Sequence, residues 1–175
     1  MIFWILFLLL ILLGIWFCIE QHVLRVRKQT LSLEHLPAGW DGVSLLQITD
    51  LHHRQMGRGN CRIIRQAQQL QPDVIVLTGD MISRDMRDFH EISKISPTYL
   101  CTGNHELDLP PEVQQEFWAM AEQAGCHPLR NETVPLEKSG CSPLYLAGAE
   151  LAYGIYRDDN RGFRHLQPYT ADDLT

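Results

Sequence analysis

The sequence has no C-x-x-C pair, and its cysteines are odd in number, five in 175 residues. Such a set excludes a framework in which every cysteine is disulfide-bonded and argues against a structural zinc site. Cys126 and Cys141 could pair in an oxidising compartment, but buried free thiols are the simpler expectation. Repeats and low-complexity stretches are also absent, so the length predicts one folded domain with a core of its own.

Basic residues are in the minority, with 15 Lys and Arg against 21 Asp and Glu, for a formal net charge of −6. A groove for nucleic acid needs a basic face, so we do not expect a nucleic-acid partner. The acidic balance does not exclude chemistry on phosphate groups, because bound metal ions reverse the local field.

Charge is missing altogether from the first 19 residues. As a helix this stretch would be about 28 Å long, close to the roughly 30 Å of a bilayer core. Trp4, Trp16 and Phe17 lie near its ends, where interfacial aromatic residues are common. A cleaved signal peptide would have a basic leading region and a small-x-small cleavage site, and both are lacking. We therefore predict a retained, single-pass membrane anchor over residues 1–19.

The side of the membrane that the rest of the chain faces is less clear from the sequence. Arg25, Arg27 and Lys28 follow the apolar stretch, which by the positive-inside rule favours a cytoplasmic domain. The same residues fit an edge strand over 23–33, where charge says little about topology, so an extracytoplasmic domain stays open. We expect residues 20–40 to connect the anchor to a domain over residues 41–175.

Three apolar runs, at 43–49, 73–78 and 97–102, have the composition of buried strands. Between the first two, Asn60 is a candidate N-cap for a helix that ends before Pro72. This order is a strand-helix-strand unit, so we expect parallel strands joined by a right-handed crossover.

Further elements follow the third run. We expect a helix over 82–96, a helix opened by Pro111 and ended by Gly125, and a strand over 143–148. The fold class is therefore α/β. The expected inner face of the helix after Pro111 consists of Val113, Phe117, Met120, Ala121 and Ala124.

Polar clusters follow directly after the three apolar runs. They contain Asp50 and His52 after the first run, Asp80 after the second, and Asn104 after the third. Parallel strands lie about 4.8 Å apart, so three adjacent strand ends span roughly 10 Å. Ligands of open α/β sheets gather at this edge. A carboxylate between other ligands suits a pair of divalent metals, which need a shared oxygen donor.

Each cluster alone has an ordinary explanation. An Asp at a strand end is usually a turn former, and a single His is usually a surface or hydrogen-bonded core residue. The combination is more specific, because three clusters that each follow an apolar strand are hard to obtain by accident.

The combined motifs resemble those of the calcineurin-like metallophosphoesterases. The matching text is Leu-Leu-Gln-Ile-Thr-Asp-Leu-His at 45–52, Pro-Asp-Val-Ile-Val-Leu-Thr-Gly-Asp at 72–80 and Gly-Asn-His-Glu at 103–106. The likeness covers roughly residues 40–150. The spacing of the motifs resembles that of the membrane-anchored bacterial branch of phosphohydrolases. The likeness implies a four-layer α/β/β/α sandwich built on two mixed sheets.

The resemblance implies a ligand set for two divalent metal ions, of manganese, iron or zinc. Asp50 and His52 would bind one ion, Asp80 would bridge both, and Asn104 would bind the second.

The resemblance also implies candidate catalytic residues. His105 would interact with the phosphate or the leaving-group oxygen, and Glu106 stands where the family often has an acidic residue able to orient or tune that histidine. The substrate would be a phosphomonoester, phosphodiester or pyrophosphate, attacked in line by a metal-activated hydroxide.

Later histidine motifs of the family are missing from the sequence. Members add a histidine after a later strand and a Gly-His-x-His cluster near the carboxyl end, whereas His127 and His165 here have neither context. We expect both to be surface residues, and the sequence to resemble the amino-terminal part of a phosphoesterase. Two hypotheses follow: a metal-dependent phosphoric ester hydrolase, and a catalytically incompetent truncated or vestigial membrane-anchored module.

Overall fold

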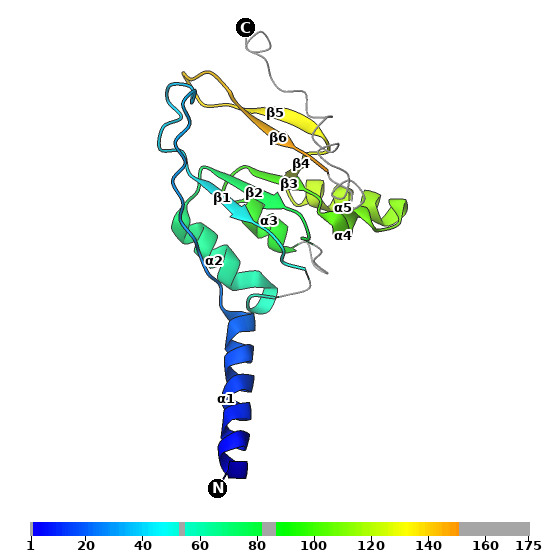
Figure 1. Ribbon diagram of the computed structural model, residues 1–175. Helices are drawn as coiled ribbons and strands as arrows, with labels where there is room; N and C mark the ends of the chain where they lie inside the picture. The colour runs from blue at the N-terminus through cyan, green and yellow to red at the C-terminus, as the bar shows by residue number, and fades with distance from the viewer. Residues whose placement is uncertain (1, 53–54, 82–86, 151–175) are drawn as a thin grey trace, which may run out of the picture. The chain divides into compact units, whose positions relative to one another are not determined.

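The computed structural model describes residues 2–52, 55–81 and 87–150 (Figure 1). His165, the start of the expected helix over 82–96 and the end of the expected domain lie outside these residues. The chain divides into two compact units, residues 1–32 and residues 33–175.

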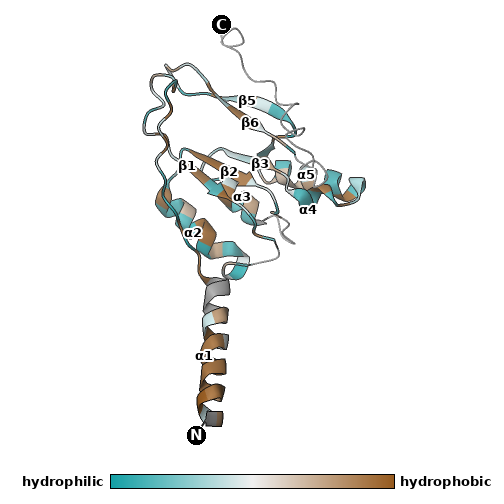
Figure 2. Ribbon diagram, viewed as in Figure 1, coloured by the Kyte–Doolittle hydropathy of each residue, from teal (hydrophilic) through white to brown (hydrophobic). Residues whose placement is uncertain are grey.

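The first unit contains one helix, α1 (Ile2–His22), which corresponds to the helix expected over residues 1–19 and ends three residues later. Its described side chains are apolar on every face (Figure 2). Where side chains are described, no helix is both long and apolar enough to cross a membrane.

The strand expected over residues 23–33 is wrong, because these residues form no regular secondary structure. Leu31 is 76% exposed and Leu33 is 62% exposed, so neither side chain packs against a core. A strand is stable only when a neighbouring strand satisfies its backbone groups, and alternation alone does not supply that neighbour.

The second unit is built on a parallel sheet in the order β1-β2-β3-β4. Its strands are β1 (Leu45–Ile48), β2 (Val74–Thr78), β3 (Thr98–Cys101) and β4 (Cys126–Pro128). The first three confirm the strands expected from the apolar runs, and the pairing of β1 with β2 is parallel as expected. β4, which contains Pro128, was not predicted.

Helices cover one face of this sheet (Figure 1). They are α2 (Cys61–Leu70), α3 (Arg87–Ser93) and α5 (Pro111–Gln123). Two shorter helices, η1 (Arg58–Asn60) and α4 (Asn104–Leu107), lie in the segments after β1 and β3. Pro111 opens α5 as predicted. Three of the residues expected on its inner side are buried, namely Phe117, Ala121 and, directly after the helix, Ala124. Trp118 is buried as well, while Val113 and Met120 are 42% and 36% exposed. The face is therefore rotated from the one expected.

Asn60 precedes α2 as predicted but does not cap it. Its backbone is left-handed, with φ of 49°, and its side chain makes no capping hydrogen bond. The side-chain oxygen accepts from the backbone N–H of Met56, and the amide group donates to buried Asp88 of α3. Asn60 thus ties the loop before α2 to a neighbouring helix.

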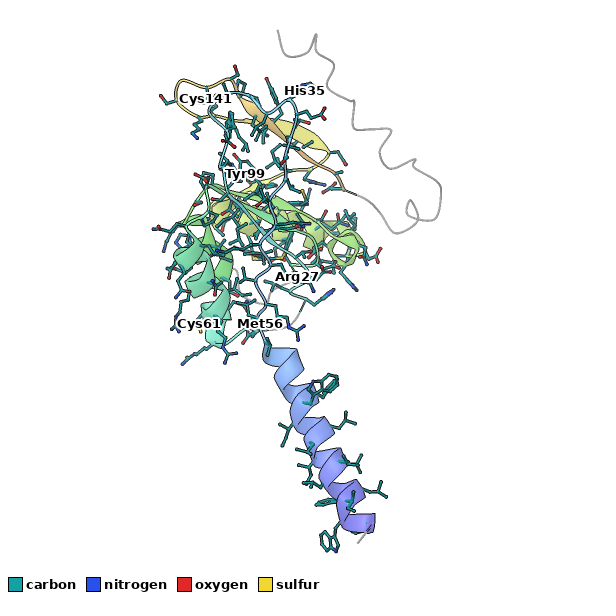
Figure 3. All side chains as sticks on the ribbon, turned by 60° about the vertical axis from the view of Figure 1, so that its left-hand side comes forward. Arg27, His35, Met56, Cys61, Tyr99 and Cys141 are labelled. Carbon is teal, nitrogen blue, oxygen red and sulfur yellow. The ribbon has the colours of Figure 1, made fainter. Side chains whose placement is uncertain are left out.

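A hairpin covers the opposite face of the parallel sheet. It consists of β5 (Glu132–Leu136) and β6 (Leu144–Gly148), which pair antiparallel, and β6 confirms the strand expected over 143–148. Trp40, Val74 and Leu136 form the centre of the cluster between the two sheets. Tyr99 packs against it (Figure 3). The layers observed are helices, parallel sheet and hairpin, which agrees with an α/β fold that contains two sheets. Within residues 33–52, 55–81 and 87–150 one sheet is all parallel and the other antiparallel, so the mixed sheets and the fourth layer implied by the resemblance are not seen there.

The four cysteines with described side chains, Cys61, Cys101, Cys126 and Cys141, are free thiols as expected, but only Cys126 is buried and Cys61 is exposed. Burial raises the pKa of Cys126 to about 11, so this thiol stays protonated at neutral pH.

Asp73 fastens the starts of β1 and β2 to one another. Its Oδ2 atom accepts hydrogen bonds from the backbone N–H of Ser44 at 2.8 Å and from the Ser44 hydroxyl at 2.7 Å. These bonds hold the pKa of the Asp73 carboxyl below the usual range of an aspartate. A carboxyl with a lowered pKa in the folded state stabilises the fold above its unfolded pKa, and this contribution disappears as the pH falls through the folded pKa.

We predict that Asp73→Ala lowers the free energy of unfolding at pH 7 by no more than about 1 kcal/mol, because Asp73 is exposed and water screens its hydrogen bonds. The difference from the unaltered chain should shrink below pH 4. Urea unfolding at pH 7 and pH 3 measures both. Glu116→Ala, on the exposed side of α5, is the control and should change stability little at either pH. An equal loss for Asp73→Ala at pH 3 and pH 7 would contradict this explanation.

Candidate metal centre

Backbone hydrogen bonds keep the loops after β1, β2 and β3 together beyond the strand ends. The N–H of Asp50 donates to the carbonyl of Gly79 at 3.2 Å, and that of His52 to the carbonyl of Asp80 at 2.8 Å. The N–H of Gly79 in turn donates to the carbonyl of Cys101 at 3.1 Å. The predicted polar clusters therefore lie at the same edge of the sheet.

The backbone at this edge adopts a conformation that side chains disfavour. Asp50, His52 and Asp80 have φ of 56°, 47° and 52°, in the left-handed region. Such residues cost about 1–3 kcal/mol each and persist where the surrounding structure holds them, often at functional sites. Asp, Asn and His are the non-glycine residues that tolerate this region best.

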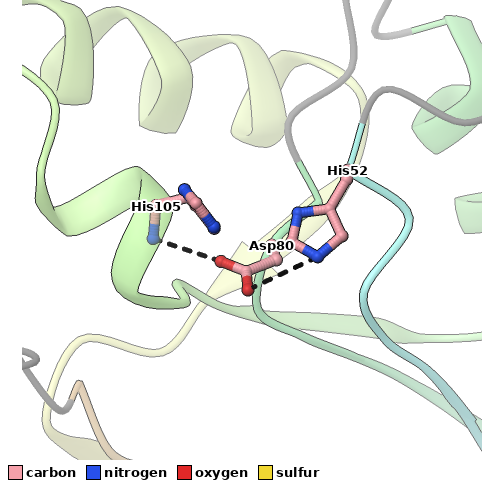
Figure 4. A group of neighbouring side chains, drawn as sticks. All are labelled: His52, Asp80 and His105. Atoms are coloured by element: carbon pink, nitrogen blue, oxygen red, sulfur yellow. Dashed lines mark hydrogen bonds and ion pairs between the residues drawn. The ribbon is translucent and has the colours of Figure 1, made fainter.

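His52, Asp80 and His105 form a group whose ligand atoms lie within 4.8 Å of one another (Figure 4). The Nε2 atom of His52 is 3.9 Å from Oδ2 of Asp80, and the backbone N–H of His105 donates to Oδ1 of Asp80 at 3.1 Å. The two imidazole rings are 5.1 Å apart and nearly perpendicular. Imidazole nitrogen and carboxylate oxygen are donors that suit zinc, iron or manganese.

The other two predicted ligands lie next to this group. Oδ1 of Asp50 is 3.8 Å from Nε2 of His52, and the Asp50 side chain is exposed. Asn104 begins α4 directly before His105 and is half-buried. The separate roles predicted for these residues stay predictions, and the geometry adds that His105, expected only as a catalytic residue, lies among the donors.

Glu106 contacts backbone rather than the imidazole groups. It is 1% exposed, and its Oε2 atom accepts from the N–H of Asp80 at 2.9 Å and from the N–H of Gly103 at 2.8 Å. Its Oε1 atom is buried and has no hydrogen-bond partner among the described residues. The Gly103-to-Glu106 spacing of a capping box is a signal in the sequence for the bond to Gly103, whereas no local signal indicates the bond to Asp80.

A second polar network, missed in the sequence, connects β3 to the hairpin. Glu150, which follows β6, accepts from the Thr102 hydroxyl at 3.2 Å and from Nε of Arg130 at 3.4 Å. The Arg130 guanidinium also lies over the Trp118 ring. Because Thr102 precedes Gly103, the network holds the segment that leads into α4.

His127, predicted to be a surface residue, is exposed.

The sequence as a whole matches a family of phosphoesterases, in agreement with the donors found at the carboxyl edge of the parallel sheet. The profile of the calcineurin-like phosphoesterase family matches residues 43–171, which is most of the chain. The chain belongs to the calcineurin-like phosphoesterase family. The resemblance inferred from the three motifs is thereby confirmed.

Relatives of the chain come from bacteria and animals. An uncharacterized metallophosphoesterase of Aquifex aeolicus is 26% identical over 85% of this chain and 60% of its own length. The uncharacterized metallophosphoesterase YkoQ of Bacillus subtilis is 26% identical over 75% of this chain and 52% of its own. A zebrafish (Danio rerio) transmembrane protein with a metallophosphoesterase domain is 31% identical over 47% and 21%. The chain thus spans 60% or less of the length of these relatives.

Gly103 gives a direct test of the geometry of this candidate metal centre. A Cβ atom at Gly103 would lie 2.5 Å from the backbone nitrogen of Asp80 and would also overlap its carboxylate. The backbone of Gly103 is extended, with φ of −93°, so alanine is sterically allowed there apart from this overlap. The nearest atoms to a side chain at Gly103 all belong to Asp80, so a substitution there would displace Asp80.

We predict that Gly103→Ala weakens the binding of Mn²⁺ by about 10–100-fold, as for the loss of a residue that orients a ligand, while the fold is retained. Titration calorimetry and circular dichroism measure the two effects. Gly14→Ala is the matched control, because nothing lies within 4 Å of a Cβ atom there. Unchanged Mn²⁺ affinity in Gly103→Ala would contradict the placement of Asp80 in the metal site.

Proposed function

We propose that this chain is a metal-dependent phosphoric ester hydrolase that uses two divalent cations of manganese, iron or zinc. The observation that carries the proposal is the carboxylate of Asp80, which lies between the imidazoles of His52 and His105. Family membership supports hydrolysis of phosphate esters as the reaction class.

The residues at the carboxyl edge of the sheet would differ in role, some binding cations and one acting on the substrate. Asp80, which is 8% exposed, would share its two carboxylate oxygens between the cations, with Asp50 and His52 on one side and Asn104 on the other. Bound cations would supply Lewis-acid stabilisation of the charge on phosphate and a nucleophile at neutral pH. His105 is exposed, so its imidazole can reach a substrate and hold or donate a proton at the leaving-group oxygen.

Asp80→Asn is the sharpest test of catalysis, because asparagine tolerates the left-handed backbone at this position but removes the charge. We predict a loss of more than about 100-fold in turnover of a chromogenic phosphodiester with Mn²⁺, beyond the range typical of outer-shell residues. Chelation by EDTA should abolish turnover, and added Mn²⁺ should restore it.

Asp41→Asn serves as the control, because Asp41 is an exposed aspartate in a turn and the change removes the same charge. Metal analysis of the purified full chain accompanies the kinetics. Less than one tightly held metal per chain, with no turnover above background, would favour the alternative of a catalytically incompetent module.

We also propose that α1 anchors the chain in a membrane, with the domain on the cytoplasmic side. The support is the uncharged sequence of residues 1–19, followed by Arg25, Arg27 and Lys28. A zebrafish relative bears the name of a transmembrane protein with a metallophosphoesterase domain.

We predict that the full chain stays in the membrane fraction after carbonate extraction, and that the double variant Leu9→Arg, Leu10→Arg moves to the supernatant. Each arginine near the middle of a spanning helix costs about 2.5–3.5 kcal/mol. A double variant Arg25→Leu, Arg27→Leu is the control, because it leaves the apolar stretch intact. Extraction of the unaltered chain by carbonate would refute the anchor.

A further inference from the structure

Glu106 makes contacts that differ from those expected of a residue acting on His105. Successive residues of a helix point about 100° apart, and in α4 this leaves His105 exposed and Glu106 1% exposed. One carboxylate oxygen accepts two backbone N–H groups, and the other has no partner among the described residues. The carboxylate therefore faces the backbone of the sheet edge.

The two N–H groups belong to different loops. That of Asp80 lies in the loop after β2, and that of Gly103 lies in the loop after β3. A single oxygen atom, Oε2, accepts both bonds, at 2.9 Å and 2.8 Å, so it fixes the distance between the loops. Glu106 is 26 residues from Asp80 along the chain, and this contact joins segments that local sequence does not hold together.

Asp80 depends on outside support for its conformation. Its backbone is left-handed, with φ of 52°, which an aspartate does not adopt without cost. The bond from its N–H to Glu106 favours this conformation, and the carboxylate then accepts from the N–H of His105. Gly103, which lacks a side chain, leaves room for that carboxylate.

We propose that Glu106 is a positioning residue for Asp80: its Oε2 atom clamps the loops after β2 and β3 and so places the carboxylate of Asp80 between His52 and His105. The clamp itself rests on the contacts described, whereas its effect on metal binding rests on the proposed function. The negative charge of Glu106 is not what the clamp needs, since one acceptor oxygen at the correct distance takes both hydrogen bonds.

Two conservative substitutions separate the clamp from a role that depends on charge. Glu106→Gln keeps the length of the side chain and one acceptor oxygen, and its amide group replaces the oxygen that has no partner. Glu106→Asp keeps the charge but is one methylene shorter, so its carboxylate cannot reach both loops. A residue that tunes His105 through its charge would tolerate Asp better than Gln, and the clamp requires the reverse order.

The experiment measures amide hydrogen exchange at Asp80 and Gly103 and the affinity for Mn²⁺ in the full chain. We expect Glu106→Gln to have the same amide exchange rates and the same affinity for Mn²⁺ as the unaltered chain. We expect Glu106→Asp to speed exchange at the two amides about tenfold, because the shorter side chain loses a hydrogen bond to one of the loops, and to weaken Mn²⁺ binding by about 10–100-fold. Glu116→Gln and Glu116→Asp, on exposed α5 surface, are matched controls that should change neither.

Each other outcome overturns the clamp. If Glu106→Gln loses amide protection and Mn²⁺ affinity while Glu106→Asp retains them, the charge of Glu106 carries the role. If both variants retain these properties, or both lose them, the acceptor geometry does not decide them. If Glu106→Asp loses the fold, seen as fast exchange throughout β2, the Gln variant alone decides. Hydrogen exchange needs neither metal nor turnover, so a chain that binds no Mn²⁺ would refute the proposed function while the exchange result still tests the clamp.

Discussion

Burial of β2 on both faces is the constraint on which the rest of the domain depends. Ile75 and Leu77 contact the cluster under the helices, whereas Val74 and Val76 contact the cluster under the hairpin. A strand with apolar side chains on both faces must lie inside a sheet and between two layers. Its carboxyl end then lies between those of β1 and β3, which places Asp80 at the middle of the polar edge.

The sequence was sufficient for the elements whose signal is local. The apolar runs, Pro111 and Gly125 identified β1, β2, β3 and the bounds of α5 because each depends on composition or on one backbone conformation. Elements whose stability comes from distant partners were not predictable in the same way. β4 is three residues long and contains Pro128, and the alternation at 23–33 predicted a strand that has no partner.

The candidate site shows the same division. Chain order and strand ends were enough to predict that Asp50, His52, Asp80 and Asn104 meet at one edge, because parallel strands bring their carboxyl ends together. His105 was expected there only as a catalytic residue, from the resemblance to the family. The bond from the N–H of Asp80 to Glu106 was not predictable, since the two residues are 26 positions apart and no local pattern connects them. The network of Thr102, Arg130 and Glu150 was also missed, because it depends on how the hairpin packs on the sheet.

The left-handed backbone at Asp50, His52 and Asp80 affects how such a site can change through evolution. Few residues accept this conformation readily, and among them are glycine and asparagine, which keep the loop shape but weaken or remove a ligand. Mutations that the scaffold tolerates are therefore those that erode the chemistry. A lineage released from selection on catalysis would keep the loops of this edge long after it had lost the ions.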